Sequence, residues 1–255
     1  MASNDHLIDL QRELSAATSL SPMKALRLTG YTAVLLAVCL FDTPKLVANS
    51  VLAELNAAQQ NSMKAGDQVV VVENVEGNAW PRVKVYRAIN ADPEQVAAIF
   101  FDFEEAKSFV PNVFKSEISN RVSPCIMEVD YGLDVPIFPD EFYTVRNSLR
   151  SIDENSYRFD WKLLRAVMTK DSVGNFRVEP WEGKSLVCYQ NLVTPSSNVA
   201  VLLRGRAIEQ MKETTKALAA HIEKERATNP AGLKKQIATL RAALRQQPSP
   251  QLTKY

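Results

Sequence analysis

Residues 204–224 read RGRAIEQMKETTKALAAHIEK, which is the longest well-patterned helix that the sequence predicts. Its apolar residues recur at steps of three and four and form one stripe: Ile208, Met211, Thr215, Leu218 and Ile222. Glutamate and lysine take the other side, and a strand-rich region precedes the helix. A sheet that curves around one long amphipathic helix buries the apolar faces of both. We therefore expect an α+β fold with a hollow between sheet and helix.

The strand-rich region alternates apolar and polar residues with a period of two. The predicted strands cover residues 114–121, 125–135, 141–152, 156–167, 175–179 and 185–193. The connections between them, including residues 136–140, 153–155 and 169–174, are short. Short connections join antiparallel neighbours, so we expect an antiparallel meander.

Two turns of this meander predict the register, and the register predicts two faces. The turns should pair Val135 with Glu141, Asp130 with Arg146, Asn147 with Trp161 and Leu149 with Phe159. An apolar face then collects Met127, Val129, Tyr131, Leu133, Tyr143, Val145, Asn147, Leu149, Tyr157, Phe159, Trp161 and Leu163. The opposite face collects Glu128, Asp130, Arg146, Arg150, Arg158, Asp160 and Lys162. We interpret this second set as a solvated ladder of cross-strand charges, in preference to an acid and base cluster.

Before the meander, residues 68–75 and 80–89 predict a hairpin around the turn at residues 76–78. Asp92 and Pro93 form a helix start, with Asp92 as the N-cap. That helix should run to about Phe101. A second short helix, at residues 103–109, should end before Pro111.

Composition excludes several classes of function. The net charge is +1 with both signs mixed along the chain, which argues against a nucleic-acid partner. The two histidines, His6 and His221, cannot build a clustered transition-metal site, and no glycine-rich phosphate loop occurs. We expect neither a metal nor a cofactor. We interpret His221, near the end of the long helix, as a surface or rim residue.

Residues 23–50 have the three-part pattern of a secretory signal. Lys24 and Arg27 precede an apolar run at residues 28–41, and Ala48-Asn49-Ser50 offers a cleavage site before Val51. We expect export to the periplasm or cell envelope. An uncleaved segment would instead associate with the membrane as an anchor, and a buried core helix is the third interpretation. In an exported protein Cys125 and Cys188 could pair, although two small buried hydrophobic residues fit better.

The sequence divides into four predicted parts. Residues 1–50 form an extension and signal peptide, and residues 51–66 a linker helix. Residues 67–226 form the ligand-binding domain. Residues 227–255 form a separate basic helix, at residues 231–246, and a proline-rich tail that we expect to be disordered.

The order of these elements resembles the START-like superfamily, which includes lipid-transfer domains, polyketide cyclase and dehydrase relatives, and coenzyme Q-binding proteins. Local motifs are similar too. Ala91-Asp92-Pro93-Glu94-Gln95-Val96 followed by Phe101-Asp102-Phe103-Glu104 resembles the start of those domains, and residues 176–180 and 183–189 resemble their last hairpin. The similarity covers residues 68–224. It implies a helix-grip fold with a ligand cavity between sheet and helix.

Two functions remain open for such a cavity. Its predicted lining is Tyr131, Tyr143, Asn147, Tyr157, Phe159 and Trp161, closed by Met211, Thr215 and Leu218. The set combines apolar side chains with a few polar end groups, as the lining of a ligand pocket does. Plain core packing is an equal alternative. We expect binding or carriage of a lipid or other hydrophobic molecule. The alternative is an enzyme of cyclase, dehydrase or hydrolase type, which the lack of a cavity histidine disfavours; a filled interaction module is the third.

Overall fold

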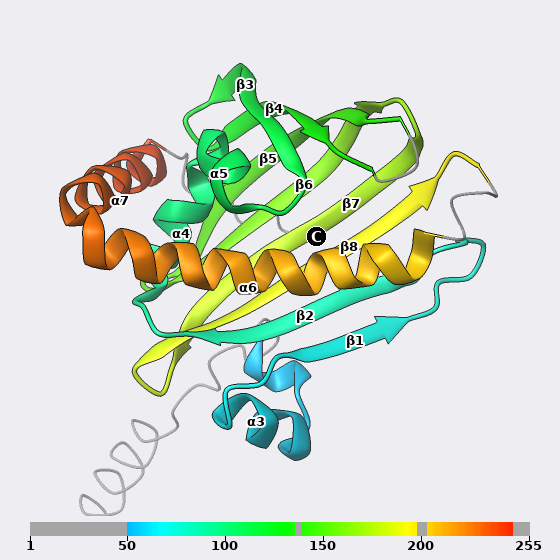
Figure 1. Cartoon of the computed structure of the whole chain (residues 1–255). Helices are drawn as coiled ribbons and strands as arrows, with labels where there is room; N and C mark the ends of the chain where they lie inside the picture. The colour runs from blue at the N-terminus through cyan, green and yellow to red at the C-terminus, as the bar shows by residue number, and fades with distance from the viewer. Residues whose placement is uncertain (1–49, 136–138, 198–202, 247–255) are drawn as a thin grey trace, which may run out of the picture. The chain divides into compact units, whose positions relative to one another are not determined.

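The centre of the molecule is an eight-stranded sheet in the order β1-β2-β8-β7-β6-β5-β4-β3 (Figure 1). The computed structural model describes residues 50–135, 139–197 and 203–246. The strands are β1 (Val69–Glu73), β2 (Arg82–Ile89), β3 (Val113–Ser123), β4 (Ile126–Leu133), β5 (Glu141–Asp153), β6 (Ser156–Ala166), β7 (Thr169–Trp181) and β8 (Lys184–Pro195). All neighbouring strands are antiparallel, which confirms the predicted hairpin and meander.

The long helix α6 (Arg204–Thr228) lies across one face of this sheet, which we call the concave face (Figure 1). Its predicted stripe is turned inward: Met211, Thr215, Leu218 and Ile222 are buried, and Ile208 is half-buried against Met211. Glutamate and lysine side chains remain on the outer side. The predicted α+β architecture, a sheet wrapped on a long C-terminal helix, is therefore confirmed.

The predicted register is right at one hairpin and displaced at the other. Asn147 lies opposite Trp161 as expected. In the β4–β5 hairpin, however, Glu141 pairs with Leu133, so that Glu128 and not Asp130 lies opposite Arg146. The connection is longer than predicted: pairing with β5 ends at Leu133, while the N–H of Asp134 donates to the carbonyl of Asn112, just before β3, at 2.8 Å. A displacement of two residues keeps every side chain on its predicted face.

Strand β7 is longer than the sequence suggests. Residues 169–174, expected to be a connection, form its first half and pair with the second half of β8. The segment is polar and ends in Gly174, so it lacks the alternation that marks a strand. Its strand structure comes from backbone pairing with β8, which overrides local propensity.

Two short helical segments follow the first hairpin and cover one end of the concave face. Helix α4 (Pro93–Phe101) begins with the predicted cap, since the Asp92 and Gln95 side chains form a capping box. The second segment is a 3-10 turn, η3 (Phe103–Glu105), followed by α5 (Ala106–Phe109). Phe100 stacks on Phe176 of β7 at 4.1 Å between ring centroids. This aromatic packing fills the space between α4 and the sheet.

Helix α7 (Pro230–Arg245) belongs to this core, whereas the sequence predicts a separate helix. It packs against α4, and Leu233, Leu240 and Ala243 are buried in the main apolar cluster. Arg241 also forms a two-pronged ion pair with Glu94 of α4, with both N–O distances 2.6 Å. The helix therefore closes the end of the core that α4 begins.

The N-terminal residues cover the opposite, convex face of the sheet. Residues 51–66, predicted as one linker helix, form a 3-10 turn, η2 (Leu52–Glu54), and α3 (Ala57–Lys64). Val51, Leu55 and Met63 are buried in a second apolar cluster with side chains of β2 and β8. The segment is thus packed on the sheet.

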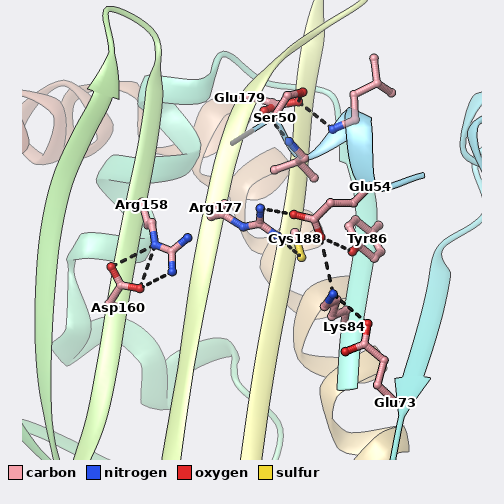
Figure 2. Close-up of polar contacts among 12 residues, drawn as sticks. Ser50, Glu54, Glu73, Lys84, Tyr86, Arg158, Asp160, Arg177, Glu179 and Cys188 are labelled. Carbon is pink, nitrogen blue, oxygen red and sulfur yellow. Dashed lines mark hydrogen bonds and ion pairs between the residues drawn. The ribbon is translucent and has the colours of Figure 1, made fainter. Parts of the chain in front are cut away.

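A polar cluster holds this segment in place (Figure 2). The Glu54 carboxylate accepts hydrogen bonds from Arg177 and from the Tyr86 hydroxyl, the latter at 2.7 Å. Arg177 also donates to Cys188 Sγ at 3.2 Å. Both Cys188 and Cys125 are buried and unpaired, as the sequence favours, and burial raises the pKa of each thiol.

The predicted export segment, residues 23–50, lies outside the described residues except for Ser50, as do residues 1–22 and the predicted tail after residue 246. Among the helices that the structure describes, none is long and apolar enough to cross a membrane.

Candidate functional site

A pocket with a volume of about 600 Å³ lies between the concave face and the first half of α6. Strands β4 to β8 supply its floor, and α6, together with its N-cap Leu203, lines it as far as Leu218. Phe103, Ala106 and Phe109 of η3 and α5 contribute one side. The hollow that the sequence predicts between sheet and helix is therefore present in the structure.

Most of the predicted lining residues meet in this pocket. They are Tyr131, Tyr143, Asn147 and Trp161 from the sheet, and Met211, Thr215 and Leu218 from α6. Tyr157 and Phe159 are not among its lining residues. Phe159 is fully buried, with its ring 4.9 Å from that of Phe100, and Tyr157 is buried in the same cluster. Both have the predicted phase, but α4 covers their end of the sheet, where phenylalanine side chains fill the space.

Stacked aromatic pairs form much of the floor. Tyr131 and Tyr143 lie side by side on β4 and β5, with ring centroids 5.3 Å apart and planes at 22°. Trp161 of β6 stacks on Tyr189 of β8 at 5.2 Å and 30°. Trp161 can reach across β7 because Gly174 lies beneath it: a Cβ there would come within 2.3 Å of the indole ring.

Burial extends the pH range over which the pocket tyrosines stay protonated. It raises the pKa of Tyr189 to about 12, and it also raises the pKa of Tyr131 and Tyr143. All three hydroxyls are therefore protonated at neutral pH and can both donate and accept hydrogen bonds. The floor thus offers uncharged polar groups within an apolar surface.

Sequence reasoning missed the contribution of β7 and β8. Phe176, Tyr189 and Asn191 line the pocket, and the Asn191 side-chain oxygen accepts hydrogen bonds from the Trp161 indole at 3.3 Å and from Ser172 at 3.2 Å. The alternation in residues 185–193 places Tyr189 and Asn191 on one face. Only the pairing of β8 with β7 and β2 shows that this face is the concave one.

The rim of the pocket carries the charged groups. Asp102 follows α4 and accepts a hydrogen bond from Gln236 of α7 at 3.0 Å. Arg204 and Arg206 stand at the start of α6, and Asp134 follows β4. The charged lining groups therefore lie at the ends of helices and strands, while the centre of the floor is uncharged.

His221, which the sequence places at the surface or the rim, is half-buried. Its ring stacks on Phe109 of α5, with centroids 4.6 Å apart and planes at 18°. Burial lowers the pKa of His221, so the imidazole is neutral at pH 7. The histidine supports the α5 side of the pocket without lining it.

Glu141 is the most buried carboxylate in the lining, with 5% of its surface exposed. Both of its oxygens accept a hydrogen bond from the backbone N–H of Met168, at 3.1 and 2.8 Å. These hydrogen bonds link the start of β5 to the β6–β7 turn, so the role of the carboxylate is structural.

Comparison with known proteins establishes the fold. No protein-family model matches this sequence, and no curated protein is significantly similar to it. Among solved structures, a STAR-related lipid transfer protein from Xanthomonas axonopodis matches with a TM-score of 0.55 and 17% identity, over 61% of this chain and 93% of that chain. Human StAR-related lipid transfer protein 5 matches with a TM-score of 0.53 and 8% identity, over 62% and 82% of the two chains. The chain has the START-like helix-grip fold, and such low identities establish the fold alone.

Proposed function

We propose that this chain binds, and carries, a hydrophobic small molecule of lipid type in the pocket between the sheet and α6. The observation that supports this most is the pocket itself. Its volume of about 600 Å³ is in the range of ligand sites, and aromatic side chains form its floor. Two solved structures with the same fold are named lipid transfer proteins, which agrees with the proposal.

An enzyme of cyclase, dehydrase or hydrolase type is the alternative. Such an enzyme needs an acid and a base, or a nucleophile with a base, aimed at one point in the pocket. Glu141 is engaged by the backbone, and the His221 ring stacks on Phe109 and is not among the pocket-lining residues. These contacts favour a binding protein over a catalyst.

The experiment is to titrate the purified full chain with Nile red, an uncharged apolar dye that fluoresces when it leaves water. Thr215→Trp is the test variant because Thr215 is buried, faces the pocket from the middle of α6 and would place an indole in the hollow. Thr239→Trp is the matched control, since Thr239 lies on the exposed side of α7. Met211→Trp fills the same hollow from one turn earlier.

We expect wild type and Thr239→Trp to bind the dye with equal affinity, and Thr215→Trp to lose at least about tenfold in affinity while it still unfolds cooperatively. Lipid extraction of the chain purified from its own cells, followed by mass spectrometry, then identifies the natural ligand. Absence of dye and lipid binding in wild type would refute the proposal. Equal binding by all variants would place the ligand elsewhere.

We also propose that the chain is exported and cleaved before Val51. The basic and apolar segment at residues 24–41 and the small residues at 48–50 support this. The backbone N–H of Val51 donates to Glu179 Oε2 at 2.8 Å, so a new α-amino group there would meet a carboxylate. Intact mass of the protein from cell fractions tests the proposal: full-length chain in the cytosol would contradict it.

A further inference from the structure

One polar side chain in the pocket has an unused hydrogen-bond donor. Asn147 lies midway along β5, is only 5% exposed and lines the pocket. Its Nδ2 group is buried and has no hydrogen-bond partner among the described residues. A buried donor without a partner costs free energy, so native structures usually supply one from protein, water or ligand.

The cross-strand neighbours of Asn147 do not supply a hydrogen-bond acceptor for its Nδ2 group. In the sheet it is paired with Met127 on one side and Trp161 on the other. Met127 offers only a thioether, and the Trp161 indole is itself a donor, which gives its proton to Asn191. Because Asn147 lines the pocket, a ligand bound there can supply the missing acceptor.

The partner must also be uncharged. Glu141, the carboxylate that lines the pocket from the same strand, is six residues away, which is about 20 Å along a strand. The lining arginines, Arg204 and Arg206, stand at the start of α6, where Arg204 donates a hydrogen bond to Asn74 at 3.3 Å. A carboxylate or phosphate at Asn147 would be buried without a counter-charge, which is costly. A carbonyl, ester or hydroxyl oxygen would accept the hydrogen bond without that cost.

We propose that the ligand of this pocket is an apolar molecule with a neutral oxygen acceptor, and that this oxygen is bound deep in the pocket by Nδ2 of Asn147. The inference rests on the proposed function and narrows its ligand class to ketones, esters and alcohols with an apolar body. Plain hydrocarbons leave the amide without a partner, and acids cannot place their carboxylate there.

Two rigid probes of nearly equal size test this inference. 9-Fluorenone carries one carbonyl oxygen, and fluorene has a methylene group in its place. Each is titrated against Nile red bound to wild type, to Asn147→Leu and to the control Asn175→Leu. Asn175 is a suitable control because it is also buried, with an unpartnered Oδ1, but it lies opposite Asp160 on the convex face.

In wild type and in Asn175→Leu the affinity ratio of fluorenone to fluorene should be about three- to tenfold higher than in Asn147→Leu, the size expected for one hydrogen bond. Fluorene should bind Asn147→Leu at least as well as wild type. Asn147→Leu should also be no less stable than wild type without ligand, because it removes an unpaired amide.

An unchanged ratio in Asn147→Leu, with both probes still bound, would overturn the inference and leave the proposed function intact. Failure of wild type to bind either probe or Nile red would refute the proposed function instead. If Asn147→Leu does not fold, Asn147→Ala replaces it. The wild-type ratio, corrected for the partition of the two probes between water and octanol, needs no variant, and a corrected ratio near one also overturns the inference.

Discussion

Replacing Glu54 by glutamine should release the N-terminal segment from the convex face. The side chain of Arg177 is only 10% exposed, and Glu54 is the carboxylate with which it pairs (Figure 2). Its other contacts are weak: one nitrogen donates to Cys188 Sγ at 3.2 Å, and Nε has no partner. Glu54→Gln therefore leaves a largely buried guanidinium without a counter-charge.

The size of the effect follows from these exposures. Removing one partner of a fully buried ion pair costs about 3–5 kcal/mol. The Glu54 side chain is 31% exposed, so water can solvate part of the site, and the glutamine oxygen still accepts a hydrogen bond. We expect a loss of about 2 kcal/mol in the free energy of unfolding. The matched control is Glu73→Gln, because Glu73 pairs with Lys84 at 2.8 Å on a more exposed site and should cost at most about 1 kcal/mol.

Urea denaturation of four proteins measures the interaction directly. These are wild type, Glu54→Gln, Arg177→Met and the double variant. If the pair is coupled, the double variant loses less stability than the two single variants together. Hydrogen exchange at residues 51–64 should rise in Glu54→Gln. Additive losses, or a loss in Glu54→Gln smaller than about 0.5 kcal/mol, would refute the argument that this ion pair holds the segment.

Three further outcomes follow from the structure. Burial raises the pKa of Glu54, but hydrogen bonds from Arg177 and Tyr86 outweigh it, so the net shift of the pKa is downward. The stability that the Glu54 carboxylate contributes is therefore complete above pH 4.5 and is lost as the pH falls through the lower pKa of the folded state. Urea denaturation at several pH values should show this loss in wild type and not in Glu54→Gln. Leu240→Ala should cost about 3 kcal/mol in the same assay, because Leu240 is fully buried; a value near zero would mean that α7 is detached in solution. Arg146→Ala should leave the urea midpoint almost unchanged, since its partner Glu128 lies on the exposed face, and a large loss would show that the pair is buried.

Much of the fold is predictable because its signals are local. The stripe on α6 and the period of two in β4, β5 and β6 are direct consequences of helix and strand geometry. The tight turn at residues 153–155 fixes the pairing of Asn147 with Trp161. Within a regular strand, the face of a side chain follows from whether its position is odd or even, so a register displaced by two residues did not alter the predicted face of any lining residue.

The parts that the sequence does not predict depend on contacts between distant segments. The first half of β7 has no strand pattern of its own and is defined by β8. The apolar residues of α7 look like those of an isolated amphipathic helix until α4 is placed beside them. Tyr157 and Phe159 have the right phase for the pocket, but phase does not tell how far along the sheet the hollow extends.

That extent follows from what each end of α6 meets. Towards its C-terminal end, Ile222 is fully buried, and α4 and α7 add phenylalanine and leucine side chains to the same cluster. Towards its N-terminal end, α6 faces Tyr131, Tyr143 and Trp161, whose rings stack on neighbouring strands and not on the helix. Rings that stack along the sheet leave the space above them open, so the core is filled at one end of α6 and hollow at the other. Binding should therefore respond to substitutions from Leu203 to Leu218, whereas substitution of Ile222 should change stability alone.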